Sequence, residues 1–162
     1  MKLVTYEIEQ KVKLGALSSD EKWIYPLSSM GIDYRCMQEL IENISESELQ
    51  LAQHYCGQEV GRIRGAAPVE EVKLLAPIPN PRQDVICLGV NYMAHAEESA
   101  RFKKEEFNGE RPYAIYFSKR VNRASATGDG IPSHRDMVQD LDYEAELAVI
   151  IGKEASHVKP EE

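Results

Sequence analysis

Apolar and polar residues follow each other at short spacing in the first part of the chain, and this pattern predicts β-strands. Apolar positions recur closely over residues 2–8 and 11–17, and residues 23–25 form a third apolar run that ends at Pro26. Between the second and third runs, residues 18–21 (Ser-Ser-Asp-Glu) are typical of a turn. We therefore expect three strands at the start of the chain.

Helical spacing replaces this pattern in the next segment. The apolar positions that show it are Met37, Leu40, Ile41 and Ile44. A second helix is expected to begin at Ser45, because Ser45 and Glu48 have the spacing of a capping box. It would continue to about Tyr55, and Gly57 would end it.

Three prolines within residues 76–81 exclude a helix interior or a central strand there. We expect residues 76–83 to form an extended linker between two parts of the chain. The part before it, residues 1–75, is predicted to be a small α+β domain without recognisable chemistry. The part after it, residues 84–162, has a different pattern.

This second part is predicted to contain strands around one helix. An apolar run over residues 85–90 has the length of a strand, and Asn91 is expected to form a turn and cap a helix. The helix would run from residue 92 to about 107, followed by a strand over residues 113–117. Residues 142–151 show the clearest strand pattern of the chain.

Composition narrows the class of protein. The chain has 162 residues, of which 43% are hydrophobic and 28% charged, as in soluble globular proteins. The formal net charge of -8 disfavours nucleic acids and anionic membranes as partners. We find neither an apolar run of the ~20 residues that a bilayer span needs nor an N-terminal apolar signal core, and we expect a cytoplasmic protein.

The three cysteines, Cys36, Cys56 and Cys87, include no Cys-x-x-Cys pair. A disulfide framework and a structural zinc site are therefore not expected.

Two acidic residues stand on one face of the strand predicted over residues 142–151. Residues two apart share a face, so Glu144 and Glu146 would lie together, and the opposite face would be apolar and buried. Two carboxylates ~5 Å apart repel by roughly 3 kcal/mol at an effective dielectric constant of about 20. A divalent cation, a shared proton, or simple exposure to water and basic side chains would each offset this repulsion.

A second chemical element lies on the predicted helix. His95 and Glu98 are three residues apart, so a helix makes them neighbours that can hydrogen-bond. A carboxylate on one imidazole nitrogen orients the ring and raises its basicity, as in a general base that activates water. An exposed surface pair is the alternative interpretation.

Four motifs, taken in order, resemble the fumarylacetoacetate hydrolase family. Pro77-Ile78-Pro79 followed by residues 86–92 (Ile-Cys-Leu-Gly-Val-Asn-Tyr) and His95-x-x-Glu98 is similar to the entry to that family's catalytic domain. Residues 117–119 (Phe-Ser-Lys) resemble its Phe-x-Lys strand, and residues 142–153 resemble its most diagnostic run. Residues 1–75 are similar to the small N-terminal domain that many bacterial members carry.

This resemblance implies a fold and roles for particular residues. The fold would be α+β and mostly β, with the N-terminal part of a β-rich catalytic fold after the linker. Glu144 and Glu146 would bind Mg²⁺ or Mn²⁺, with Ca²⁺ as an alternative. His95 and Glu98 would be the catalytic dyad, and Lys119 would lie near the substrate or, equally, be a solvated strand lysine.

The implied function is a divalent-metal-dependent hydrolase or lyase that acts on small 2-oxo-acids by acylpyruvate-type C–C hydrolysis, decarboxylation or isomerisation, in a cytoplasmic homodimer. The family completes its metal site with an aspartate further along than Glu146, so we expect these residues to be the N-terminal portion of a longer protein. The alternative is a catalytically incomplete fragment or a binding module of the same fold. Members that cleave fumarylacetoacetate carry an extra acid before the histidine; residues 87–90 (Cys-Leu-Gly-Val) lack it.

Overall fold

The chain folds as an α+β protein with more strands than helices, as expected. The computed structural model describes residues 1–59, 63–103, 113–159 and 161. They form two compact units, residues 1–79 with 125–162, and residues 80–124. The predicted linker at residues 76–83 stays a prediction. Within the described residues, no helix is long and apolar enough to cross a membrane.

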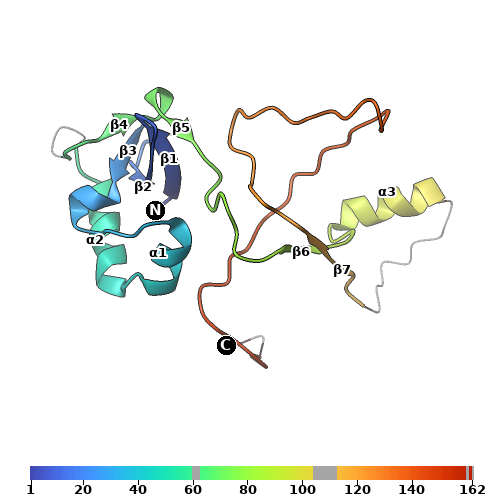
Figure 1. The fold of residues 1–162 in the computed structure, drawn as a ribbon. Helices are drawn as coiled ribbons and strands as arrows, with labels where there is room; N and C mark the ends of the chain where they lie inside the picture. The colour runs from blue at the N-terminus through green and yellow to red at the C-terminus, as the bar shows by residue number, and fades with distance from the viewer. Residues whose placement is uncertain (60–62, 104–112, 160, 162) are drawn as a thin grey trace. The chain divides into compact units, whose positions relative to one another are not determined.

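The first unit contains an antiparallel sheet in the order β4-β3-β2-β1-β5 (Figure 1). Its strands are β1 (Leu3–Ile8), β2 (Lys11–Leu17), β3 (Trp23–Pro26), β4 (Ala67–Pro68) and β5 (Lys73–Leu74). The three long strands lie where the alternating pattern predicts them. The two-residue strands β4 and β5 were not predicted, because two residues are too few to show a period.

A two-residue turn sets the register of the first hairpin. Ile8 pairs with Lys11, so Glu9 and Gln10 alone connect β1 to β2. Both residues have positive φ, 50° and 61°. Tight hairpin turns of this kind need positive φ at both central positions because their twist matches that of the strands. The sheet pairing therefore holds two residues that do not favour this conformation.

Two helices and a short 3-10 helix provide the rest of the core of this unit. They are α1 (Met37–Asn43), α2 (Glu46–Cys56) and η1 (Leu27–Met30), and a second 3-10 helix, η3 (Val69–Glu71), precedes β5. The buried side chains they share with β2 and β3 include Leu14, Ala16, Tyr25, Leu27, Met30, Ile32, Met37, Leu40, Ala52, Cys56 and Ile63. The helical apolar pattern thus faces the sheet.

The predicted capping box at the start of α2 is present. The Glu48 amide donates a hydrogen bond to Ser45 Oγ (3.2 Å), and the Ser45 amide donates one to Glu48 Oε2 (2.8 Å). At the other end of α2, burial raises the pKa of the Cys56 thiol. Cys56 is therefore a core residue and not an activated nucleophile.

Two hydrogen bonds link the proline-rich segment to Thr5, a buried residue of β1. The Leu75 amide donates to the Thr5 carbonyl (2.9 Å), and the Thr5 hydroxyl donates to the Pro77 carbonyl (2.6 Å). Thr5 is only 2% exposed, so these bonds lie away from water. They hold residues 75–77 extended along the edge of the sheet beyond β5.

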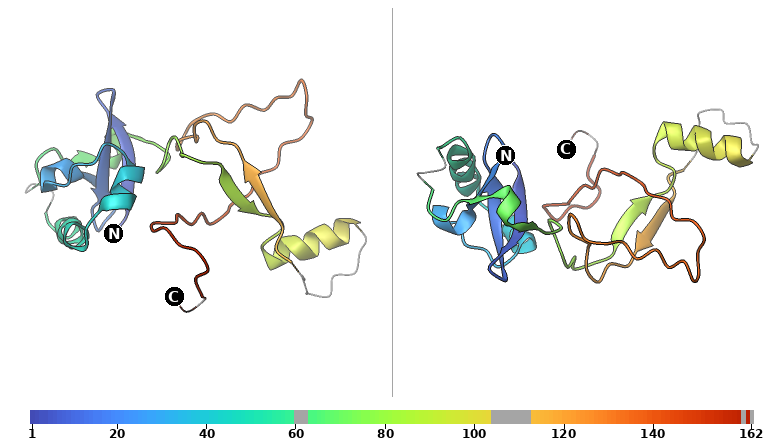
Figure 2. Two further views of the ribbon diagram at one scale, coloured as in Figure 1. Left: turned by 60° about the horizontal axis from the view of Figure 1, so that its bottom comes forward. Right: turned by 90° about the horizontal axis from the view of Figure 1, so that it is seen from above.

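The second unit consists of a strand pair and a helix, β6 (Val85–Leu88), α3 (Met93–Lys103) and β7 (Tyr116–Lys119) (Figure 2). Strand β6 ends two residues before the predicted boundary. Strand β7 begins at Tyr116 and not at Tyr113, because pairing with β6 covers only residues 116–119. The predicted end of the helix, residues 104–107, lies outside the described residues.

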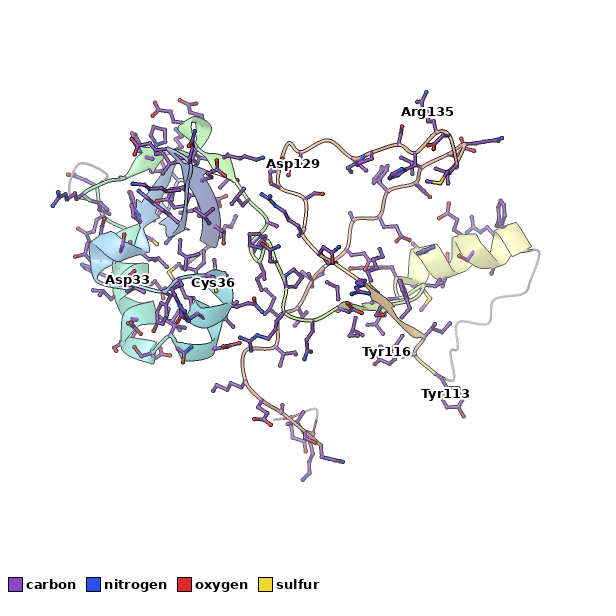
Figure 3. All side chains as sticks on the ribbon, viewed as in Figure 1. Asp33, Cys36, Tyr113, Tyr116, Asp129 and Arg135 are labelled. Carbon is purple, nitrogen blue, oxygen red and sulfur yellow. The ribbon has the colours of Figure 1, made fainter. Side chains whose placement is uncertain are left out.

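The strand predicted over residues 142–151 does not form among the described residues. These residues have no regular secondary structure and are all exposed, including the apolar face that was expected to be buried, with Tyr143 89% and Leu147 82% exposed. A strand needs a neighbour for its backbone N–H and C=O groups, and no described strand pairs with this segment. Asp129, which precedes this segment in the chain and is labelled in Figure 3, forms an ion pair with Lys73 of β5 (2.8 Å).

The packing around Gly15 generates the first test. A Cβ at this position would lie 2.5 Å from Ile24 Cγ2 and 3.0 Å from Tyr6 Cε1, and both neighbours are fully buried. We expect Gly15→Ala to lower the free energy of unfolding by about 2–3 kcal/mol through overpacking. Urea denaturation followed by the fluorescence of Trp23, the single tryptophan, measures this change.

Gly57→Ala is the matched control. Its added Cβ would lie 3.6 Å from the His54 carbonyl oxygen, an ordinary contact, and its φ of -90° suits alanine. We expect a change of no more than about 0.5 kcal/mol. Equal effects of the two substitutions would contradict the close approach at Gly15.

Candidate functional site

A sharp strand-to-helix connection positions the predicted dyad. Four residues, 89–92, join β6 to α3. The Gly89 amide donates to the Ile115 carbonyl (2.8 Å), which extends the β6–β7 pairing by one step. The Ala96 amide donates to the Tyr92 carbonyl (3.0 Å), so Tyr92 occupies the N-cap position. Our prediction that Asn91 caps this helix is wrong by one residue.

Gly89 and Val90 are each constrained within this connection, Gly89 by a close contact and Val90 by its backbone conformation. A Cβ on Gly89 would lie 3.3 Å from Ile115 Cγ2, so the close approach of the neighbouring strand favours glycine there. Val90 has φ of 48°, in the left-handed region. For an L-residue this conformation costs about 1–2 kcal/mol, and a β-branched side chain rarely adopts it. The turn therefore stores strain directly before the helix that carries the dyad.

His95 and Glu98 both lie on α3, one turn apart, as the spacing predicts. His95 is half-buried and Glu98 is exposed, while Ala96 between them is 4% exposed and faces the interior of its unit. The helix thus anchors itself through Ala96 and presents the histidine at the edge of the buried region. The pairing of the two side chains as a dyad stays a prediction.

Lys119 lies at the other end of the β6–β7 strand pair from the start of α3. It pairs with Val85, the first residue of β6, whereas the last residue, Leu88, pairs with Tyr116. Three residues of strand separate these pairs by about 10 Å. Lys119 Nζ lies 6.0 Å from the centre of the Phe117 ring on the same strand face. The β6–β7 pairing therefore does not bring Lys119 beside the beginning of α3.

Tyr116 pairs with Leu88, the last residue of β6, and so lies at the end of the strand pair where the connection to α3 begins. The sequence patterns did not predict a role for Tyr116. Its side chain is 68% exposed and points away from the ribbon (Figure 3). The register Leu88–Tyr116 places it there, and register cannot be deduced from one strand alone. Its position makes it a further candidate contact for a ligand near α3, and the place of Lys119 near the substrate stays a prediction.

Glu144 and Glu146 lie on an exposed segment without regular secondary structure and not on the strand of a packed sheet. Water then screens their charges. At a dielectric constant of about 80 and ~5 Å, the repulsion falls to roughly 0.8 kcal/mol. The electrostatic reason to expect a bound cation is therefore much weaker in this conformation than in a packed sheet.

The described residues do not complete a metal centre. The carboxylates of Glu144 and Glu146 are hard oxygen donors, which suit Mg²⁺ or Mn²⁺. However, no group of three or more His, Cys, Asp or Glu side chains suited to hold a metal occurs among the residues that the structure describes. The donor type fits, and the described residues supply only part of the ligand set that such a centre needs.

The comparison with known families concerns the second half of the chain. Residues 84–162 match the family described as fumarylacetoacetate (FAA) hydrolase C-terminal. This chain belongs to the fumarylacetoacetate hydrolase family. Divalent-metal dependence is general in this family. All five predicted site residues lie inside the matched stretch.

Individual relatives agree with this assignment. Oxaloacetate tautomerase YisK of Bacillus subtilis (strain 168) is 40% identical over 94 residues, 58% of this chain and 30% of that protein. The mitochondrial oxaloacetate tautomerase fahd2 of Xenopus laevis is 36% identical over 92 residues, 56% of this chain and 26% of that protein.

An uncharacterized protein of Staphylococcus aureus (strain USA300) is 25% identical over 170 residues, 98% of this chain and 53% of that protein. This chain thus spans about half the length of that relative, and the stretches matched in the two tautomerases are shorter still.

The incomplete donor set generates a metal-binding prediction. We expect this chain to bind Mn²⁺ with a dissociation constant of roughly millimolar size, because two exposed carboxylates form a weak site. Glu146→Gln should weaken binding further, whereas Glu154→Gln, a matched change on the same exposed stretch, should not. Paramagnetic broadening of backbone amide signals during a Mn²⁺ titration measures both. Micromolar binding that survives Glu146→Gln would contradict the assignment of this residue.

Proposed function

We propose that this chain carries part of the active site of a divalent-metal-dependent enzyme that acts on small 2-oxo-acids. The observation that carries the proposal is the family match over residues 84–162, which contains His95, Glu98, Glu144 and Glu146. When bound, the metal would polarise the oxo group and stabilise the enolate. Glu144 and Glu146 would supply two of its ligands.

Within this class we favour keto–enol isomerisation over C–C bond cleavage. Two relatives, one from a bacterium and one from a frog, are named oxaloacetate tautomerases. Isomerisation requires only that a base remove a proton beside the oxo group and that an acid return one to the oxygen. His95 would perform the proton transfer at its imidazole, and the Glu98 carboxylate would orient the ring.

Acylpyruvate-type C–C hydrolysis and decarboxylation are the alternative reactions of the same site. Hydrolysis additionally needs a positioned water, which the same imidazole would activate. The third alternative is a catalytically incomplete fragment or a binding module. The exposed positions of Glu144 and Glu146 favour it over an enzyme for the 162 residues by themselves.

The test follows the loss of the ultraviolet absorbance of enol-oxaloacetate with the native gene product and Mg²⁺ or Mn²⁺. We expect His95→Gln to lower the catalysed rate by about 10²–10⁴-fold, as loss of a general base does. Glu97→Gln is the matched control on α3, because Glu97 is exposed and pairs with Arg101 (3.7 Å). It should leave the rate unchanged.

Two further outcomes separate the alternatives. Release of pyruvate from an acylpyruvate substrate, lost in His95→Gln, would favour hydrolysis over isomerisation. An unchanged rate in His95→Gln for every substrate would remove this residue from the mechanism.

A further inference from the structure

The connection between β6 and α3 has a feature that the proposed chemistry does not use. Val90 is a β-branched residue with φ of 48°, whereas glycine or asparagine adopts such a conformation at lower cost. It lies between Gly89, held by the hydrogen bond to Ile115, and Tyr92, which accepts the first hydrogen bond of α3. Strain of this kind persists only where the surrounding structure enforces it.

Geometry explains why the chain needs a left-handed residue here. Strand β6 ends at Leu88 and helical backbone begins at Met93, so the chain must change direction within four residues. The Gly89 amide is still bonded to β7, and Tyr92 is already part of the helix cap. The change in direction is left to Val90 and Asn91, and it is Val90 that takes the positive φ.

We propose that Val90 is a positioning residue for His95. Its left-handed backbone sets the direction in which α3 leaves β6, and thereby fixes where the first turns of α3, with His95, stand relative to the β6–β7 strand pair. This inference rests on the proposed role of His95 in proton transfer. It assigns the function to the backbone conformation at position 90 and not to the isopropyl side chain.

Two substitutions separate these possibilities. Val90→Asn places a residue that tolerates the left-handed region, so the turn is kept with less strain. Val90→Pro fixes φ near -65° and forbids the observed conformation. Position 90 is half-buried and lies in the unit of residues 80–124, whereas the N-terminal sheet belongs to the other unit. Both variants are therefore expected to keep that sheet folded. Trp23, on β3 of the other unit, reports on that sheet independently through its fluorescence.

Hydrogen exchange on this chain is the first measurement. The Ala96 amide, which donates to the Tyr92 carbonyl, reports on the first turn of α3. In Val90→Pro we expect it to exchange about tenfold faster or more, with unchanged Trp23 fluorescence. In Val90→Asn we expect protection equal to or greater than that of the parent chain. Unchanged exchange in Val90→Pro, or equal loss in both variants, would overturn the proposal.

The second measurement distinguishes positioning from general stability. In the tautomerase assay on the native gene product, Val90→Pro should lower kcat about tenfold or more with little change in KM. Val90→Asn should keep kcat close to the value of the unsubstituted protein. A purely structural role would lower the amount of folded protein and leave the kcat of the folded fraction intact. If His95→Gln has no effect on the rate, the proposed function fails, while the exchange data still decide whether Val90 directs α3.

Discussion

Pairing of backbone hydrogen-bonding groups decides which apolar segments of this chain become sheet. In the first unit β1, β2 and β3 pair with neighbours in the sequence, whereas the short strands β4 and β5 pair with the distant β3 and β1. The two-residue turn at Glu9 and Gln10 closes the first hairpin despite its unfavourable backbone. In the second unit, β6 pairs with β7 over only four residues. Residues 142–151 have the strongest strand pattern but no described partner, and they stay exposed.

The same constraint governs the candidate site. Pairing of β6 with β7 continues to the Gly89–Ile115 hydrogen bond, and the strained turn at Val90 follows immediately. The position of His95 therefore depends on three successive features: the β6–β7 strand pairing, the close contact at Gly89 and the left-handed backbone of Val90. The segment that carries Glu144 and Glu146 pairs with none of the strands that the structure describes.

The sequence predicts well where local chemistry decides the structure. The capping box of Ser45 and Glu48 and the alternation in β1 and β2 follow from neighbours within a few residues, and the structure confirms them. The prediction fails where a distant partner decides. Nothing local to residues 142–151 tells whether a strand will pair with them, and nothing in Gly-Val-Asn-Tyr indicates that Val90 takes the positive φ. The register of β7 against β6, which separates Lys119 from the start of α3, likewise cannot be deduced from either strand alone. The place of Lys119 near the substrate stays a prediction.

Strand pairing and cation binding at residues 142–151 are expected to be thermodynamically coupled. In the exposed segment, water reduces the repulsion between Glu144 and Glu146 to roughly 0.8 kcal/mol. Docking the segment into a sheet would bury the apolar face of Tyr143, Leu147 and Ile151 and lower the local dielectric constant. The repulsion would then rise to roughly 3 kcal/mol and oppose docking. If these two carboxylates bind a divalent cation, as we propose, the cation would offset the larger penalty of the docked state more than the small one of the exposed state. Cation binding would then favour the sheet, and the sheet would in turn strengthen cation binding.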